Sequence, residues 1–129
     1  MQTDKNMTET IYGQVVGKAN HYQAVPDGNG GRRIIKDDLI RAYERSFVQQ
    51  CKVYKDRLID GRFKLQVKVY FLSSANDLDN AVKTILDCLQ MCNAITNDNN
   101  CYDIHAIKCV DATNPRVVFS LIEEEPSLF

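Results

Sequence analysis

Residues 64–89, KLQVKVYFLSSANDLDNAVKTILDCL, decide the fold, because two hydrophobic periods meet in them. From Leu65 to Phe71 apolar and polar residues alternate, and this period of two predicts a strand with one buried face. After the turn residues SSAND, apolar residues recur every three or four positions between Leu78 and Leu89, which predicts an amphipathic helix. A strand that leads directly into such a helix indicates a domain in which helices pack on a sheet.

The sequence on either side supplies the remaining elements. The same signals predict a strand over 11–16, a turn-rich loop over 23–33, a helix that begins at Asp37 or Asp38 and runs to Cys51, a turn over 96–100, and closing strands over 102–110 and 116–122. The predicted order is β-α-β-α-β-β. It describes one α+β domain with a mixed β-sheet on which two main helices pack. We expect a flexible N-terminus over 1–10, the domain over 11–122 and an acidic tail over 123–129.

The composition excludes several classes of protein. The chain has 129 residues, of which 44% are hydrophobic and 26% charged, so it is neither disordered nor fibrous, and no apolar run is long enough to span a membrane. The polar start MQTDKNMTET is unlike a signal peptide. Five cysteines without a Cys-x-x-Cys motif are typical of buried thiols in a reducing compartment, which predicts a cytoplasmic location.

The charge is distributed unevenly along the chain. The net charge is only −1, which argues against nucleic-acid binding. Residues 1–70, however, hold thirteen Lys and Arg against eight Asp and Glu, whereas residues 71–129 hold three against nine. This pattern fits a basic contact surface beside an acidic segment that could bind a metal ion.

Three carboxylates and one lysine near the second predicted helix could carry chemistry. If Asp77 is the N-cap and Asp79 lies in the first turn, both can converge at the positive end of the helix dipole, with Lys83 one turn later. Asp98 lies in the turn after the helix and joins them only if the chain doubles back. In the alternative interpretation Asp77 is only a cap, Asp79 and Lys83 form an ordinary ion pair, and Asp98 is a solvated turn residue.

The segments D77-L-D-N-A-V-K-T-I-L-D87-C-L and I95-T-N-D98 resemble the RusA family of Holliday junction resolvases. The segments G17-K-A-N-H-Y22 and G31-R-R-I-I35 are similar to the N-terminal pattern of that family. The resemblance spans about residues 11–122, and its most specific part is the D-x-D-N-x-x-K core.

The resemblance implies roles for individual residues. It makes Asp77, Asp79 and Asp98 the acidic ligands of Mg²⁺ and Lys83 a basic residue of the catalytic site. Where the family has an acidic pair in the turn, this chain has Asn97 and Asp98, so one carboxylate is replaced by an amide. The resemblance further implies that Asn80 and Asp87 support the helix, and that Lys108 matches a lysine common in the next strand.

The expected function is a Mg²⁺-dependent endodeoxyribonuclease that resolves four-way DNA as a homodimer. Its two-fold symmetry would match the pseudo-two-fold symmetry of the junction. The alternatives are a metal nuclease that acts on other branched DNA and a non-catalytic branched-DNA-binding protein of the same fold. The residues expected to contact DNA phosphates are basic, polar or aromatic: Lys18, Asn20, Tyr22, Arg32, Arg33 and Lys36.

Overall fold

The computed structural model describes residues 7–17, 22–36 and 38–124. Its elements follow in the order β1 (Glu9–Tyr12), β2 (Tyr22–Pro26), β3 (Arg32–Lys36), α1 (Asp38–Gln50), β4 (Phe63–Phe71), α2 (Leu78–Met91), the 3₁₀ turn η1 (Asp98–Asn100), β5 (Cys101–Val110) and β6 (Arg116–Glu123). Within these ranges neither helix has the length and apolar character needed to span a bilayer.

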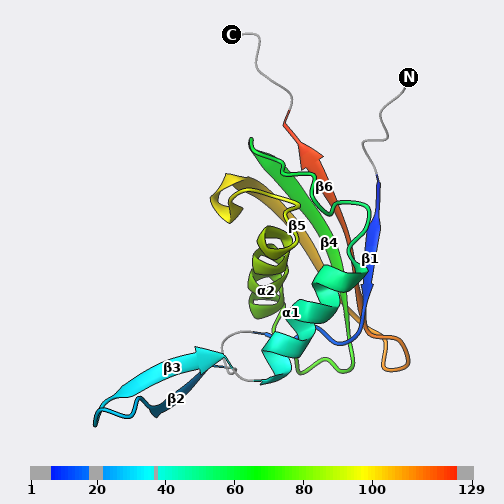
Figure 1. Ribbon diagram of the computed structural model, residues 1–129. Helices are drawn as coiled ribbons and strands as arrows, with labels where there is room; N and C mark the ends of the chain where they lie inside the picture. Colours follow the sequence, from blue (N-terminus) through cyan, green and yellow to red (C-terminus); the bar gives the residue numbers. More distant parts are fainter. Residues whose placement is uncertain (1–6, 18–21, 37, 125–129) are drawn as a thin grey trace.

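The central sheet has four strands in the order β1-β6-β4-β5 (Figure 1). β4 and β5 are parallel, with Leu65 opposite Ile104, and α2 forms the crossover between them. β6 is antiparallel to both β4 and β1. The predicted mixed sheet with two helices is therefore confirmed, and the fold belongs to the α+β class.

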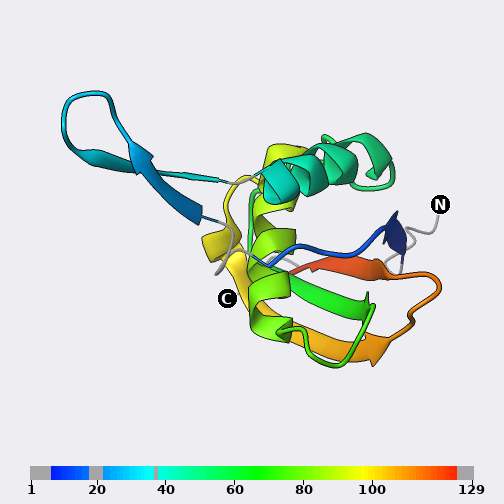
Figure 2. The ribbon, with the colours of Figure 1, turned by 90° about the horizontal axis from the view of Figure 1, so that it is seen from below.

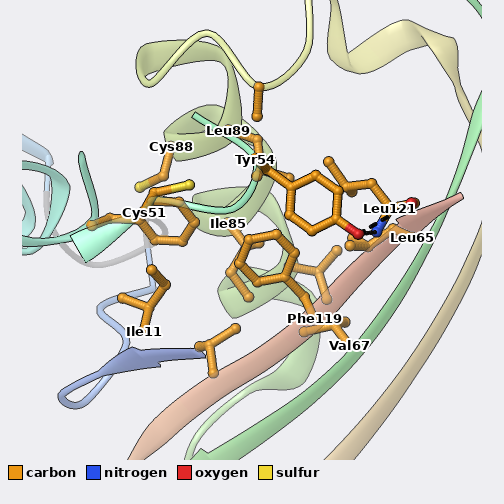
Figure 3. Close-up of a cluster of buried hydrophobic side chains, with 14 of the residues drawn as sticks. Ile11, Cys51, Tyr54, Leu65, Val67, Ile85, Cys88, Leu89, Phe119 and Leu121 are labelled. Atoms are coloured by element: carbon orange, nitrogen blue, oxygen red, sulfur yellow. Dashed lines mark hydrogen bonds between the residues drawn. The ribbon is translucent and has the colours of Figure 1, made fainter. Parts of the chain in front are cut away.

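Both helices cover the same face of this sheet (Figure 2). Alternate residues of β4 from Phe63 to Phe71 are buried against the helices, as the period of two predicts. In Figure 3, Ile85 lies among the core side chains together with Phe119 of β6. Phe119 also stacks on Phe47 of α1, with ring centroids 5.9 Å apart. The core is thus a single layer between the sheet and the helices.

The predicted loop over 23–33 is wrong in part, because residues 22–26 and 32–36 form an antiparallel hairpin. Its turn carries the residues that favour such a reversal. Gly28 and Gly30 have positive φ angles, and Asp27 Oδ1 accepts hydrogen bonds from the backbone N–H groups of Asn29 and Gly31. This hairpin, which we call the arm, projects away from the helix layer (Figures 1 and 2).

Candidate active site

The first turn of α2 holds two of the predicted site residues. Asp77 is the N-cap, as expected, and its Oδ1 accepts a hydrogen bond of 2.9 Å from the backbone N–H of Asp79. Its Oδ2 accepts a bond of 3.2 Å from the side-chain amide of Asn80. Both aspartates are exposed, and the N-terminal end of a helix favours negative charge. The start of α2 therefore presents two carboxylates to solvent.

Two lysines accompany this end of the helix. Lys83 is exposed and follows Asp79 by four residues, which places both on one face of α2. The two form no ion pair with each other, so that part of the alternative interpretation is not supported. Lys108 of β5 donates a 2.7 Å hydrogen bond to the carbonyl of Ser74, in the loop that leads to α2. Lys108 thus ties β5 to the loop that precedes α2.

The third predicted carboxylate lies at the opposite end of α2. The backbone N–H of Asp98 donates a hydrogen bond to the side chain of Gln90, in the last turn of the helix. Thirteen residues separate Asp77 from Gln90, which corresponds to about 20 Å of helix. The described residues contain no group of three His, Cys, Asp or Glu side chains that could hold a metal ion.

The expectation that Asp77, Asp79 and Asp98 converge within one chain is therefore wrong. The reason is topological. Asp98 lies in η1, before β5, and the chain returns toward the start of α2 only along β5, which runs parallel to β4. In a parallel crossover the helix starts near the C-terminal ends of the two strands and ends near their N-terminal ends. The residues before and after the helix therefore lie far apart.

The segment that precedes the arm packs directly along the first two turns of α2. Thr84 Oγ1 donates a 2.7 Å hydrogen bond to the carbonyl of Val16. Gly17 lies so close that a Cβ there would be 2.9 Å from the Cβ of Asn80. This contact ends only a few residues before β2, so it places the base of the arm beside the end of α2 that carries Asp77 and Asp79.

Four of the six predicted DNA-contact residues fall on the arm: Tyr22, Arg32, Arg33 and Lys36. Arg32 begins β3 and is exposed. Arg33 pairs in register with Val25 across the hairpin, and Tyr22 pairs with Lys36. Lys18 and Asn20 lie outside the described residues.

These features occur in a chain that matches a known family. The family model described as Endodeoxyribonuclease RusA matches residues 13–121, which include the arm, both helices and strands β4 and β5. The chain belongs to the RusA endodeoxyribonuclease family. A search of curated proteins finds no match.

Proteins of the RusA family are endodeoxyribonucleases that act on branched DNA. Endodeoxyribonuclease is therefore the function class of this chain. Membership of the family also gives meaning to the amide at position 97. Asn97 is the N-cap of η1, and its Oδ1 accepts a 2.8 Å hydrogen bond from the backbone N–H of Asn99. Asn and Asp cap helices about equally well, so the local structure tolerates either residue.

Sequence reasoning missed two residues that organise this site. Gln90 holds the turn with Asp98 against α2, but a glutamine late in a helix gives no signal of that role. The close approach of Gly17 to Asn80 is different, because the glycine belongs to the N-terminal motif and Asn80 to the D-x-D-N core. The only sequence signal of this contact was that Gly17 and Asn80 both belong to motifs of the same family.

Proposed function

We propose that this chain is a Mg²⁺-dependent endodeoxyribonuclease that resolves four-way DNA junctions as a homodimer in the cytoplasm. The observation that carries the proposal is the exposed pair Asp77 and Asp79 at the start of α2, beside a projecting arm with Arg32, in a chain of the RusA family. Carboxylate oxygens suit Mg²⁺, and arginines suit DNA phosphates.

One chain alone does not fit the metal, because Asp98 lies at the far end of α2. We therefore propose that Asp98 of one copy completes the site formed by Asp77 and Asp79 of the other. Mg²⁺ held by these carboxylates would supply a water molecule of lowered pKa as the nucleophile for phosphodiester hydrolysis. Lys83 contributes positive charge beside the carboxylates and holds the scissile phosphate in place.

The free edge of β5 supports this arrangement. β5 is the last strand of the sheet, and its outer edge pairs with no other described strand. It exposes large apolar side chains, among them Ile104 at 47% and Val110 at 54%. An unprotected edge of this kind is a template for strand pairing.

Two copies that pair their β5 strands antiparallel about a two-fold axis form one continuous sheet. The pairing sets the start of β5 in one copy opposite the end of β5 in the other. η1 with Asp98 directly precedes β5, and the loop bonded to Lys108 leads into α2 near the end of β5. In this arrangement Asp98 of each copy lies near the end of the paired β5 strands at which Asp77 and Asp79 of the other copy lie.

A subunit-mixing experiment tests this proposal. Asp77→Asn and Asp98→Asn variants should each fail to cut a synthetic four-way junction in Mg²⁺ but should still bind it. After mixing and re-association, each heterodimer carries one site with all three carboxylates, so nicking should return to about a quarter of the wild-type site number under random assortment. The matched control is a mixture of Asp77→Asn with Asp79→Asn, which leaves no intact site and should stay inactive.

The outcomes separate the parts of the proposal. Nicking by the Asp98→Asn protein at the wild-type rate would remove Asp98 from the site. Inactive variants without complementation would reject the shared site. Wild-type cleavage in excess EDTA would reject the metal mechanism.

The arm is tested by salt dependence. Removal of one phosphate contact should reduce the slope of log affinity against log salt by about 0.9, so an Arg32→Ala/Arg33→Ala variant should flatten the slope by about 2. A Lys52→Ala/Lys55→Ala variant removes two exposed lysines after α1 and should leave the slope unchanged. Equal slopes for all three proteins would move the DNA surface away from the arm.

A second candidate function is a non-catalytic protein that binds branched DNA. The observation that favours it is Asn97, because one acidic residue of the family's turn is an amide here. An Asn97→Asp variant separates the candidates. Cleavage that appears only in this variant supports the binding protein, and cleavage by the wild type supports the nuclease. A wild type that cuts flaps or forks but not four-way junctions would indicate a nuclease for other branched DNA.

A further inference from the structure

Two buried thiols and a buried carboxylate form a chain of contacts where the C-terminal ends of the two helices meet. Cys51 directly follows α1, and Cys92 is the C-cap of α2. Their sulfur atoms are 3.6 Å apart, and Cys51 Sγ lies 3.3 Å from Oε1 of Glu9. Cys51 is 1% exposed, Cys92 2% and Glu9 5%. This cluster lies far from the start of α2 and plays no part in the proposed cleavage.

The contacts give the two thiols different roles. The Cys92 thiol donates a hydrogen bond to Cys51 Sγ, and the Cys51 thiol donates one to Oε1 of Glu9. The interaction between the two thiols, followed by burial, raises the pKa of Cys51, whereas the same interaction lowers the pKa of Cys92. Cys92 is therefore the sulfur that we assign as the attacking group. The carboxylate of Glu9 is fixed beside Cys51, because its Oε1 also accepts hydrogen bonds from the backbone N–H groups of Lys52, Val53 and Tyr54.

We propose that Cys51 and Cys92 are a peroxide-oxidation site that closes to an intramolecular disulfide. The Cys92 thiolate attacks one oxygen of hydrogen peroxide, the O–O bond breaks, and Cys92 becomes a sulfenic acid as hydroxide leaves. Cys51 then attacks the Cys92 sulfur, its proton passes by way of Glu9 to the departing hydroxide, and water leaves. The hydroxide of the first step takes the proton that Cys92 released, so two thiols and one peroxide give one disulfide and two waters.

Closure would tie together two segments that already run side by side. The backbone N–H of Asp56 donates a 3.1 Å hydrogen bond to the carbonyl of Cys92, and that of Leu58 a 2.8 Å bond to the carbonyl of Asn93. The second segment continues directly into the turn that carries Asp98. The disulfide would therefore clamp the base of that turn to the end of α1.

The test starts from the wild-type protein, so that no variant has to fold. Fully reduced protein is treated with hydrogen peroxide in slight excess, and the intact mass should fall by about 2 Da, the mass of two hydrogens. Tandem mass spectrometry of the digest should show a peptide with Cys51 linked to Cys92 rather than to Cys88, which lies one helical turn earlier. The melting temperature should rise by about 10 °C and return to its original value with a dithiol reductant, because the bond closes a loop of about forty residues.

Variants provide the control. A Cys101→Ser/Cys109→Ser protein loses the two half-buried thiols of β5 and should still form the disulfide. Cys51→Ser and Cys92→Ser proteins should show neither the mass loss nor the thermal shift. Oxidation of Cys101 or Cys109 with no Cys51–Cys92 peptide in the folded protein would overturn the proposal, as would a linkage that forms only in denaturant. Neither result bears on cleavage, which does not need these thiols.

Discussion

A single methyl group at position 17 should disturb both stability and cleavage. In Gly17→Ala the new Cβ would lie 2.9 Å from the Cβ of Asn80, closer than carbon atoms approach in proteins. The Asn80 Cβ cannot rotate away because it is bonded to the helix backbone, so either α2 or the segment before the arm must shift by several tenths of an ångström. The shift stretches the 2.7 Å hydrogen bond from Thr84 to the carbonyl of Val16.

The magnitude follows from three contributions. Overpacking destabilises the folded protein by about 1–3 kcal/mol and the weakened hydrogen bond by about 1 kcal/mol. Alanine also lowers the conformational entropy of the unfolded chain, which stabilises the folded protein by about 0.4–1 kcal/mol. We therefore expect Gly17→Ala to lower the free energy of unfolding by about 1–3 kcal/mol in urea, with an unchanged m-value. Cleavage of a four-way junction should fall as well, because the base of the arm moves relative to Asp77.

A matched substitution provides the comparison. Gly61→Ala places its Cβ in open space, so that protein should be as stable as the wild type or slightly more stable. If both alanine variants unfold at the same urea concentration, or if Gly17→Ala is the more stable, the close contact with Asn80 does not constrain this part of the molecule.

Two further predictions concern buried polar groups. Glu9→Ala should cost about 3–5 kcal/mol in urea unfolding, because three backbone N–H groups lose a charged acceptor, while Glu9→Gln should cost less than half as much; equal costs would show that the charge is unimportant. Burial raises the pKa of Tyr43 well above its usual range, and its hydroxyl finds no partner among the described residues. The contribution of Tyr43 to stability is present below the unfolded pKa of about 10 and is lost as the pH rises above it. Because the buried hydroxyl has no hydrogen-bond partner in the described part of the chain, Tyr43→Phe should be somewhat more stable than the wild type at pH 8, and its advantage should grow by pH 11. Identical pH profiles for the two proteins would contradict this.

The parts of the fold that were predicted from the sequence are those that local periodicity determines. The strand ending at Phe71, the cap at Asp77 and the helix after it were found because each depends on neighbours within a few residues. The arm was missed in part because its strands are short and lack clear alternation, so only the turn around Asp27 carried a signal. The position of Asp98 could not be predicted, because it depends on whether β5 runs parallel or antiparallel to β4.

The pairing of β1 with β6 has a consequence for how the chain folds. The two strands come from opposite ends of the described chain, with Glu9 opposite Phe119, and β1 pairs with no other described strand. During synthesis β4, α2 and β5 can assemble as they emerge, but β1 must wait, unpaired, until the ribosome has delivered β6. Pairing between such distant segments is slow, because a long loop must close before any contact forms. Until β6 inserts between β1 and β4, each of those two strands has an unpaired hydrogen-bonding edge. The nascent chain is most prone to aggregation during this interval.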